Sequence, residues 1–326
     1  MMVKSSSFMW RIKYYMTDYW DDVADARTAH LPLVAGGPWT VISIVLVYLF
    51  FVKIAGPRIM RDRKPFDLKK PMLLHNIILA VGNGLGCFVA LVASSFGRDV
   101  FSCLPVSQKT ASNYSNNNSP TELISTFQDY VYIYGGWLYF ASKFIDFLDT
   151  IFFVLRKRDR QVSGLHVFHH SFMPIATFVG VKFIPGGNIV LVPLVNTFIH
   201  SVMYTYYAIS VAGSEYKKYL WWKKYLTLAQ VVQFIIIICH STYGLMQKDC
   251  SFHPIFHVFE LFYASVFFAL FLQFYLKTYV YSDNKNRQPL QHTMEIKKKG
   301  RLPIVMTNNN SLDFDDQVLL EKIKSL

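Results

Sequence analysis

The sequence has few charged residues for its size. Asp, Glu, Lys and Arg make up 17% of its 326 residues, while 52% are hydrophobic and 17% are aromatic. Soluble domains carry about 25% charged residues. A single globular core could not bury this much apolar surface, so the composition excludes an ordinary soluble domain and favours a lipid bilayer as the solvent.

Other features are missing as well. No basic segment is interleaved with aromatic residues in a soluble module, so we expect no nucleic-acid binding despite the formal net charge of +12. Residues 1–30 lack the basic, apolar and small-residue order of a cleaved signal peptide, and we expect none. We find no internal repeat.

Long apolar stretches dominate the rest of the chain. About 20 helical residues cross the ~30 Å hydrocarbon core of a bilayer. Seven such stretches predict an all-α membrane protein with seven transmembrane helices. They occupy residues 39–55, 72–95, 133–155, 166–184, 188–212, 226–246 and 255–279. The predicted organisation is an N-terminal segment 1–38, a transmembrane catalytic domain 39–279 and a tail 280–326.

The charges of the loops predict the orientation. Basic residues are in excess in the loops 53–70, 156–162 and 213–225 and in the tail, whereas residues 1–39 and 96–132 are balanced. Because basic loops stay in the cytosol, we expect a lumenal N-terminus and a cytosolic C-terminus.

Two further signals agree with this orientation. Glycosylation sequons at Asn113 and Asn117 lie in a polar loop on the expected lumenal side. Lys322 and Lys324 resemble a dilysine retrieval signal of the endoplasmic reticulum, which requires a cytosolic tail, although a basic tail can also contain such a pair by chance.

Charged residues inside expected spans mark a candidate site, because such charges are costly in lipid. Lys143, Asp146 and Asp149 recur every three residues in KFIDFLDT and share a helical face. A purely structural ion pair between Lys143 and Asp146 is the alternative. Glu260 is the other charge well inside a span.

Histidines form a second group. His166, His169 and His170 fall on one stripe of the fourth span, which is difficult to explain as packing alone. Asn196 and His200 share a face of the fifth span with Tyr204 or Tyr207, and the sixth span begins with a stripe of Thr227, Gln230 and Gln233. Taken singly, the tyrosines and glutamines could simply join helices by hydrogen bonds.

The predicted topology brings these stripes together. The polar stripes of the third, fourth, fifth and sixth spans each lie in the cytosolic half of the span. One buried polar chamber open to the cytosol would therefore surround all four stripes. Unrelated packing contacts would not be expected to coincide in depth.

The motifs resemble those of the ELO family of very long chain fatty acid elongases. KFIDFLDT resembles its KxxExxDT box, HVFHH its HxxHH box, HSVMYTYY its HxxMYxYY box, and TLAQVVQ its TxxQxxQ-type box. GPRIMRDRKPFDLK resembles the family's segment after the first span, and the resemblance covers about residues 30–280. Asp146 departs from the pattern, since the family usually has Glu there.

The resemblance implies a 3-oxoacyl-CoA synthase of the endoplasmic reticulum membrane. Such an enzyme condenses an acyl-CoA with malonyl-CoA and releases CO2 and CoA, with no bound cofactor. The acyl chain would lie in a tunnel inside an inverted-barrel-like bundle surrounded by membrane lipid. CoA phosphates would pair with Lys and Arg at the cytosolic mouth. A reductase and a dehydratase of the elongation cycle are the expected protein partners.

The expected chemistry uses imidazole, because the chamber contains no cysteine. We expect His169, also the residue to which the resemblance points, to attack the thioester and carry the acyl group. His166 and His170 would handle protons, and His200 with Asn196 would polarise the thioester or enolate oxygen. The residues expected to orient this set are Lys143, Asp146, Asp149, Tyr204, Tyr207, Gln230 and Gln233.

Two other classes of protein share part of the pattern. Di-iron desaturases also have HxxHH boxes, but they need more clustered histidines than this sequence offers, so we expect no metal. Among the remaining histidines, His75, His200, His240 and His257 are scattered. A seven-helix receptor or transporter would fit the topology but would not explain the histidine stripe.

The four cysteines support one structural prediction. Cys87 and Cys239 fall inside expected spans and read as small apolar residues. Cys103 and Cys250 fall in two lumenal loops, where disulfides can form, and we predict that they pair. Unchanged mobility on non-reducing gels would count against this bond.

Overall fold

The computed structural model describes residues 8–101, 126–247 and 252–281. The chain divides into two units, Met1–Tyr275 and Leu276–Leu326. In the second unit, the described part is a short π-helix, Leu276–Tyr281. In the described ranges the regular structure is helical, without a β-strand, which confirms the all-α fold class.

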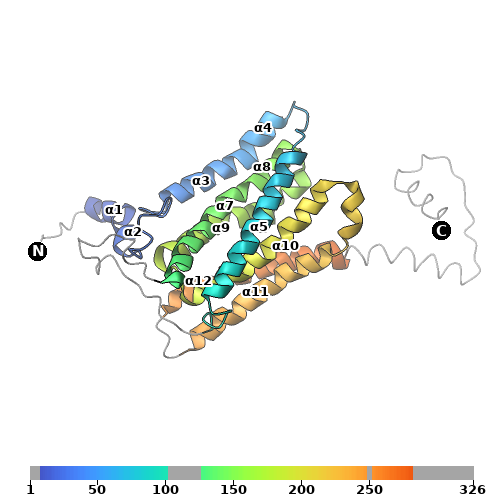
Figure 1. Cartoon of the computed structure of the whole chain (residues 1–326). Coiled ribbons are helices and arrows are strands. Elements are labelled where there is room, and N and C mark those ends of the chain that lie inside the picture. The colour runs from blue at the N-terminus through green and yellow to red at the C-terminus, as the bar shows by residue number, and fades with distance from the viewer. Residues whose placement is uncertain (1–7, 102–125, 248–251, 282–326) are drawn as a thin grey trace, which may run out of the picture. The chain divides into compact units, whose positions relative to one another are not determined.

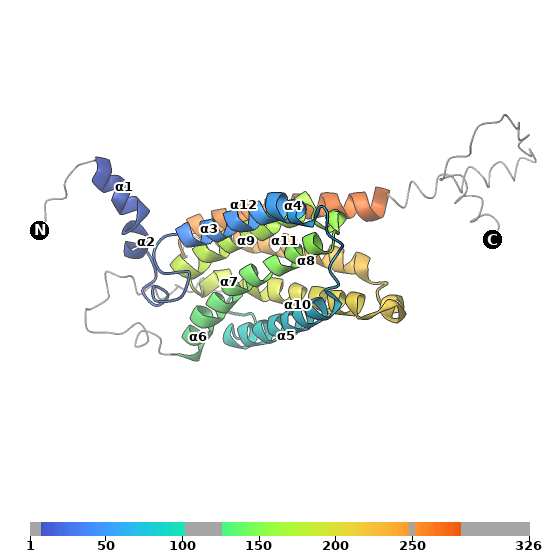
Figure 2. The same cartoon turned by 90° about the horizontal axis from the view of Figure 1, so that it is seen from above.

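The first unit is a bundle of helices that run alongside one another (Figures 1 and 2). α5 packs along α10, α11 packs along α12, and α9 contacts both α3 and α7. The helices are α1 (Phe8–Met16), α2 (Tyr19–Asp22), α3 (Trp39–Phe50), α4 (Gly56–Met60), α5 (Lys69–Ala93), α6 (Phe127–Tyr130), α7 (Gly136–Ile145), α8 (Phe147–Leu155), α9 (Gly164–Phe183), α10 (Leu191–Ala212), α11 (Lys223–Met246) and α12 (Pro254–Tyr275).

Five helices in the described ranges are long and apolar enough to cross a membrane: Trp39–Met60, Lys69–Ala93, Gly187–Ala212, Lys223–Met246 and Pro254–Tyr281. The other two expected spans are present as helices but do not meet this measure. α7 and α8 are separate short helices, and α9 carries three histidines that lower its apolarity. The count of seven spans therefore remains a prediction.

The break between α7 and α8 falls at the candidate site. The carbonyl of Asp146 accepts a hydrogen bond from the backbone N–H of Asp149 at 3.2 Å, which is a tightened i to i+3 turn. At the start of α9, the side chain of Ser163 caps the helix by accepting from the N–H of His166. The segment KFIDFLDT therefore contains a tightened turn between its two carboxylates, and the segment HVFHH begins at a capped helix end.

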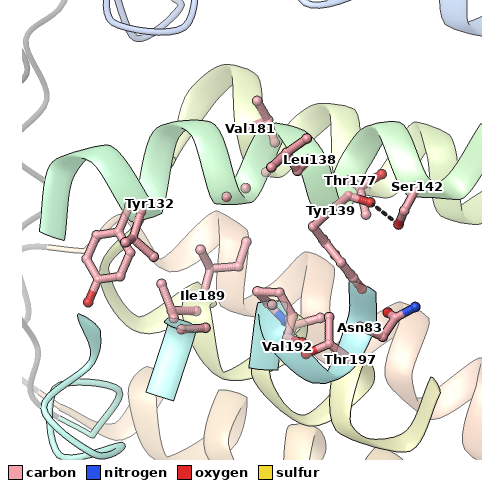
Figure 3. A pocket seen from close by; sticks show the side chains of 18 of the residues that line it. Asn83, Tyr132, Leu138, Tyr139, Ser142, Thr177, Val181, Ile189, Val192 and Thr197 are labelled. Atoms are coloured by element: carbon pink, nitrogen blue, oxygen red, sulfur yellow. Dashed lines mark hydrogen bonds between the residues drawn. The ribbon is translucent and has the colours of Figure 1, made fainter. Parts of the chain in front are cut away.

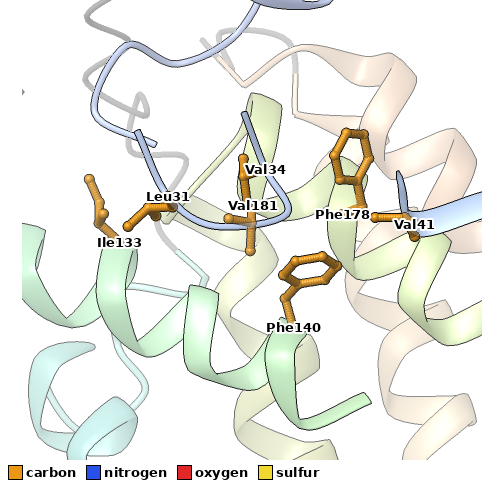
Figure 4. Close-up of a cluster of buried hydrophobic side chains, with 7 residues drawn as sticks. All are labelled: Leu31, Val34, Val41, Ile133, Phe140, Phe178 and Val181. Atoms are coloured by element: carbon orange, nitrogen blue, oxygen red, sulfur yellow. The ribbon is translucent and has the colours of Figure 1, made fainter. Parts of the chain in front are cut away.

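The segment before α3 packs onto the bundle. Leu31 and Val34 join a buried apolar cluster with Phe140 of α7 and with Phe178 and Val181 of α9 (Figure 4). A buried ion-pair network reinforces this contact: Arg27 binds Asp25 at 2.8 Å and Asp129 at 2.9 Å.

Replacing Arg27 with methionine is expected to destabilise this end of the bundle. The guanidinium is 3% exposed, and its loss leaves the Asp25 carboxylate buried without its cation, which costs about 3–5 kcal/mol. Thermal unfolding of the purified protein in detergent measures the effect. The matched control is Arg11→Met, because Arg11 is exposed on α1. Equal melting temperatures for both variants would show that the network contributes no stability.

Candidate active site

The three histidines of α9 lie together as expected. The ring centroids of His166 and His170 are 4.1 Å apart, and those of His169 and His170 are 5.5 Å apart. All three side chains are partly exposed rather than sealed in the core. Pro174 has no N–H to offer the carbonyl of His170, so that carbonyl lacks its usual helical donor.

A hydroxyl pair holds His166. Its Nε2 lies 2.9 Å from the Oγ1 of Thr150 on α8, and this hydroxyl lies 2.8 Å from the hydroxyl of Tyr48 on α3. Thr150 and Tyr48 are both buried. Three helices therefore fix the orientation of the first histidine of the stripe.

Lys143 and Asp146 form the intrahelical ion pair that was named as the alternative interpretation, with Nζ and Oδ2 3.5 Å apart. The ammonium of Lys143 also donates to Oδ1 of Asn196 on α10 at 3.3 Å and lies over the ring of Tyr139. The hydroxyl of Tyr139 donates to the same Asn196 oxygen at 2.9 Å. Asn196 is thus joined to the lysine of α7, as the common-chamber hypothesis requires.

Tyr204 connects the two carboxylates. Its hydroxyl lies 2.9 Å from Oδ1 of Asp146 and 2.8 Å from Oδ2 of Asp149, and the side chain is completely buried. The ring of His200, one turn earlier on α10, lies 5.8 Å from the Tyr204 ring. The Nδ1 of His200 is buried without a hydrogen-bond partner among the described residues.

His75 belongs to this cluster although the sequence did not identify it. Its Nε2 lies 3.0 Å from Oδ1 of Asp149, and its ring contacts Tyr204. Its position in the sequence could have indicated this, because His75 lies in the first two turns of α5, directly after the basic loop 53–70. The depth argument that joined the other stripes applies to His75 equally. Tyr139 was missed because it is one aromatic residue among many.

Some expected orienting residues lie elsewhere. Gln230 of α11 donates to the sulfur of Met203, and the Oε1 of Gln233 is buried without a partner among the described residues. Tyr207 packs edge-on against Tyr204 at the margin of the cluster. Asp149, expected to orient the imidazoles of the site, contacts the imidazole of His75.

Glu260 is separate from this site. Its carboxylate accepts from the hydroxyl of Ser241 at 3.1 Å and lies 3.5 Å from Nδ1 of His257. The residues that the structure describes contain no group of His, Cys, Asp or Glu able to hold a metal ion. Cys103, Cys250, Asn113, Asn117, Lys322 and Lys324 lie outside the described residues.

An apolar cavity of about 550 Å³ adjoins the polar cluster. Its walls come from α5, α7, α9, α10 and α12, from the π-helix Val131–Gly135 before α7, and from the segment 184–190 between α9 and α10. Figure 3 shows Tyr132 at one end of this cavity and Tyr139, Ser142 and Asn83 at the other. Leu85 and Leu138 line the cavity and are about 60% exposed, so the cavity opens between α5 and α7.

Comparison with known proteins gives a consistent result. Residues 33–287 match the model of the ELO family, described as the GNS1/SUR4 family. A very long chain fatty acid elongase 7 of Drosophila melanogaster is 38% identical over 83% of this chain and 77% of its own length. The rat elongase 7 is 37% identical over 92% of this chain and 94% of its own, and human elongase 4 is 37% identical over 79% and 76%. The chain therefore belongs to the ELO family.

Proposed function

We propose that this protein is the condensing enzyme of fatty acid elongation, a very-long-chain 3-oxoacyl-CoA synthase. Its relatives are named very long chain fatty acid elongases, which supports elongation in general terms. The proposed reaction joins a long-chain acyl-CoA to malonyl-CoA, gives a 3-oxoacyl-CoA two carbons longer, and releases CO2 and CoA. It takes place in the membrane of the endoplasmic reticulum, with the N-terminus in the lumen and the tail in the cytosol.

The position of the polar cluster at the end of the apolar cavity carries this proposal. On α9, the face with His169 continues as cavity wall at Met173, one turn later, and at Thr177, two turns later. On α10, His200 is one turn from Thr197 of the wall, and on α7 Lys143 is one turn from Tyr139. An acyl chain in the cavity would thus present its thioester to the histidines.

The proposed reaction has two steps. A neutral imidazole of His169 attacks the thioester, CoA leaves with the proton of the ring N–H, and the acyl group remains on the ring. Malonyl-CoA then loses CO2, and the electron pair of the broken bond forms the new bond to the acyl carbon. His166 and His170 handle protons, while His200 and Asn196 bind the developing oxygen charge.

The CoA group would stay outside the cavity. The loop between α8 and α9 presents Lys157, Arg158 and Arg160, all exposed, directly before the capped start of the histidine helix. These cations suit the phosphates of CoA. The opening between α5 and α7 would let an acyl tail that already lies in the bilayer enter sideways.

Microsomes that express the chain test this proposal. Radioactive malonyl-CoA and a long-chain acyl-CoA are expected to give a 3-oxoacyl product, and acetyl-CoA in place of malonyl-CoA is expected to give none. Microsomes without the chain provide the background. Expressing microsomes with no product above this background, over a series of acyl lengths, would refute the function.

The metal content distinguishes this function from that of a di-iron oxidase. Purified protein is expected to contain no stoichiometric iron by elemental analysis, because the proposed chemistry needs only imidazole and carboxyl groups. Two iron atoms per chain, together with oxygen consumption in the presence of an acyl substrate, would favour a desaturase instead.

A further inference from the structure

The hydrogen bonds around Tyr204 need more hydrogen atoms than this hydroxyl can supply. The hydroxyl carries one hydrogen but lies within 2.9 Å of two carboxyl oxygens, one from Asp146 and one from Asp149. Only one of these contacts can use the tyrosine hydrogen, so the other needs a hydrogen from a carboxyl group. Both carboxyl groups are less than 10% exposed, and burial makes an unpaired contact between two oxygens costly.

The charges of Lys143, Asp146, Asp149 and His75 also indicate one additional proton in this group. Lys143 supplies one positive charge, and two ionised carboxylates with a neutral His75 would leave one negative charge in excess. One added proton makes the buried group neutral, which low-dielectric surroundings favour. By the hydrogen count this proton sits on the carboxyl pair, and the 3.0 Å contact between His75 and Asp149 gives it a route to and from His75.

The other groups near His75 do not change this count. Its ring packs against Phe152 and Tyr204. Arg156, the C-cap residue of α8, is not part of the buried group that is counted, because its side chain is partly exposed and its guanidinium donates to the sulfur of Met72, one turn before His75 on α5. His166 is bound to Thr150 rather than to a carboxyl group.

We propose that His75, Asp149, Tyr204, Asp146 and Lys143 form a relay that supplies the proton consumed in each turnover. This inference rests on the two-step reaction proposed above. In the first step the imidazole gives its own proton to the thiolate of CoA, so no further proton is needed. In the second step the bond between the acyl carbon and the ring nitrogen breaks, and this nitrogen must take up one proton.

The geometry gives the relay a direction. Successive heavy-atom distances are 3.0 Å from His75 to Asp149, 2.8 Å and 2.9 Å across Tyr204, and 3.5 Å from Asp146 to Lys143. Lys143 ends the series beside Asn196, one turn from His200. His75 begins it near the start of α5, where a proton can enter from the basic end of the bundle. His75 is thus a positioning and proton-supplying residue that does not touch the substrate.

If the relay exists, a substitution of His75 should slow the second step of the reaction but not the first. In His75→Gln the amide can still donate to Asp149 but cannot carry an extra proton. We expect the acyl adduct to form from acyl-CoA at the wild-type rate, as measured by quenched-flow mass spectrometry of the full-length protein. Its decay on addition of malonyl-CoA should slow by about 100-fold, and most strongly at high pH.

A second variant guards against an effect on folding. In His75→Ala, free imidazole in the buffer is expected to restore part of the decay rate. The control is His257→Gln, which removes a buried histidine outside the site and should change neither step. Equal slowing of both steps in both His75 variants, or an unchanged decay rate in His75→Gln, would overturn the relay. A wild-type protein that elongates but forms no adduct would instead refute the acyl-imidazole step on which the relay rests.

Discussion

Replacing His169 with alanine is expected to abolish condensation, with a loss in turnover on the order of 10⁴-fold or more. The imidazole is the group proposed to bind the acyl chain covalently, and no cysteine among the described residues lies in the polar cluster to replace it. The ring of His169 packs against Phe267 of α12, so its removal leaves the Thr150 contact of His166 intact. The rate of malonyl-CoA-dependent product formation by the purified variant gives the measurement.

A matched control separates chemistry from folding. His253→Ala removes an exposed histidine next to α12 and is expected to retain full activity. His169→Ala should keep the wild-type melting temperature in detergent while losing activity. Product formation at more than a few per cent of the wild-type rate would show that His169 is not the acyl carrier.

Replacing Tyr132 with alanine is expected to shift the products to longer acyl chains, by at least one two-carbon unit. Tyr132 closes the cavity at the end away from Lys143, and about 15 Å of helix separates it from Ser142. Its hydroxyl is held by Gln128 at 2.8 Å, and its ring lies against Gly186, where an added Cβ would come within 2.6 Å of it. The backbone of Gly186 has φ of +112°, which also disfavours a larger residue there.

Two further variants complete this test, with product lengths measured by mass spectrometry over a series of acyl-CoA substrates. Gly82→Leu should shorten the products, because Gly82 lines the cavity and an added Cβ meets open space there. Tyr130→Ala should leave product length unchanged, since Tyr130 is 50% exposed and does not line the cavity. Identical product lengths for all three variants would show that the acyl chain does not occupy this cavity.

The sequence predicted the parts of the site that depend on helical periodicity. The spacing of His166, His169 and His170 placed them on one face, and the spacing of Lys143 and Asp146 likewise placed these two on one face. The alternation of basic loops then joined these stripes at one depth. Contacts of Asn196 with Lys143, and of Tyr204 with both aspartates, agree with that interpretation.

Periodicity does not say which helices are neighbours. The packing of α5 along α10 brings His75 to Asp149, and a single histidine in an apolar stretch gave no sign of this partner. The same limitation explains why the position of Gln230 was not predicted. This residue was expected at the site, but its side chain contacts Met203. The pairing of Arg27 with Asp129 joins positions 102 residues apart, so no local pattern could have revealed it.

Intact-protein mass spectrometry tests the central claim most directly. The wild-type protein incubated with acyl-CoA alone is expected to gain the mass of one acyl group, located on His169 by fragmentation, while free CoA is released. Adding malonyl-CoA should remove this mass and yield the 3-oxoacyl product. Acylation that persists unchanged in His169→Ala, or a requirement for both substrates before any CoA is released, would contradict the account and leave His169 as a base or a substrate-positioning residue.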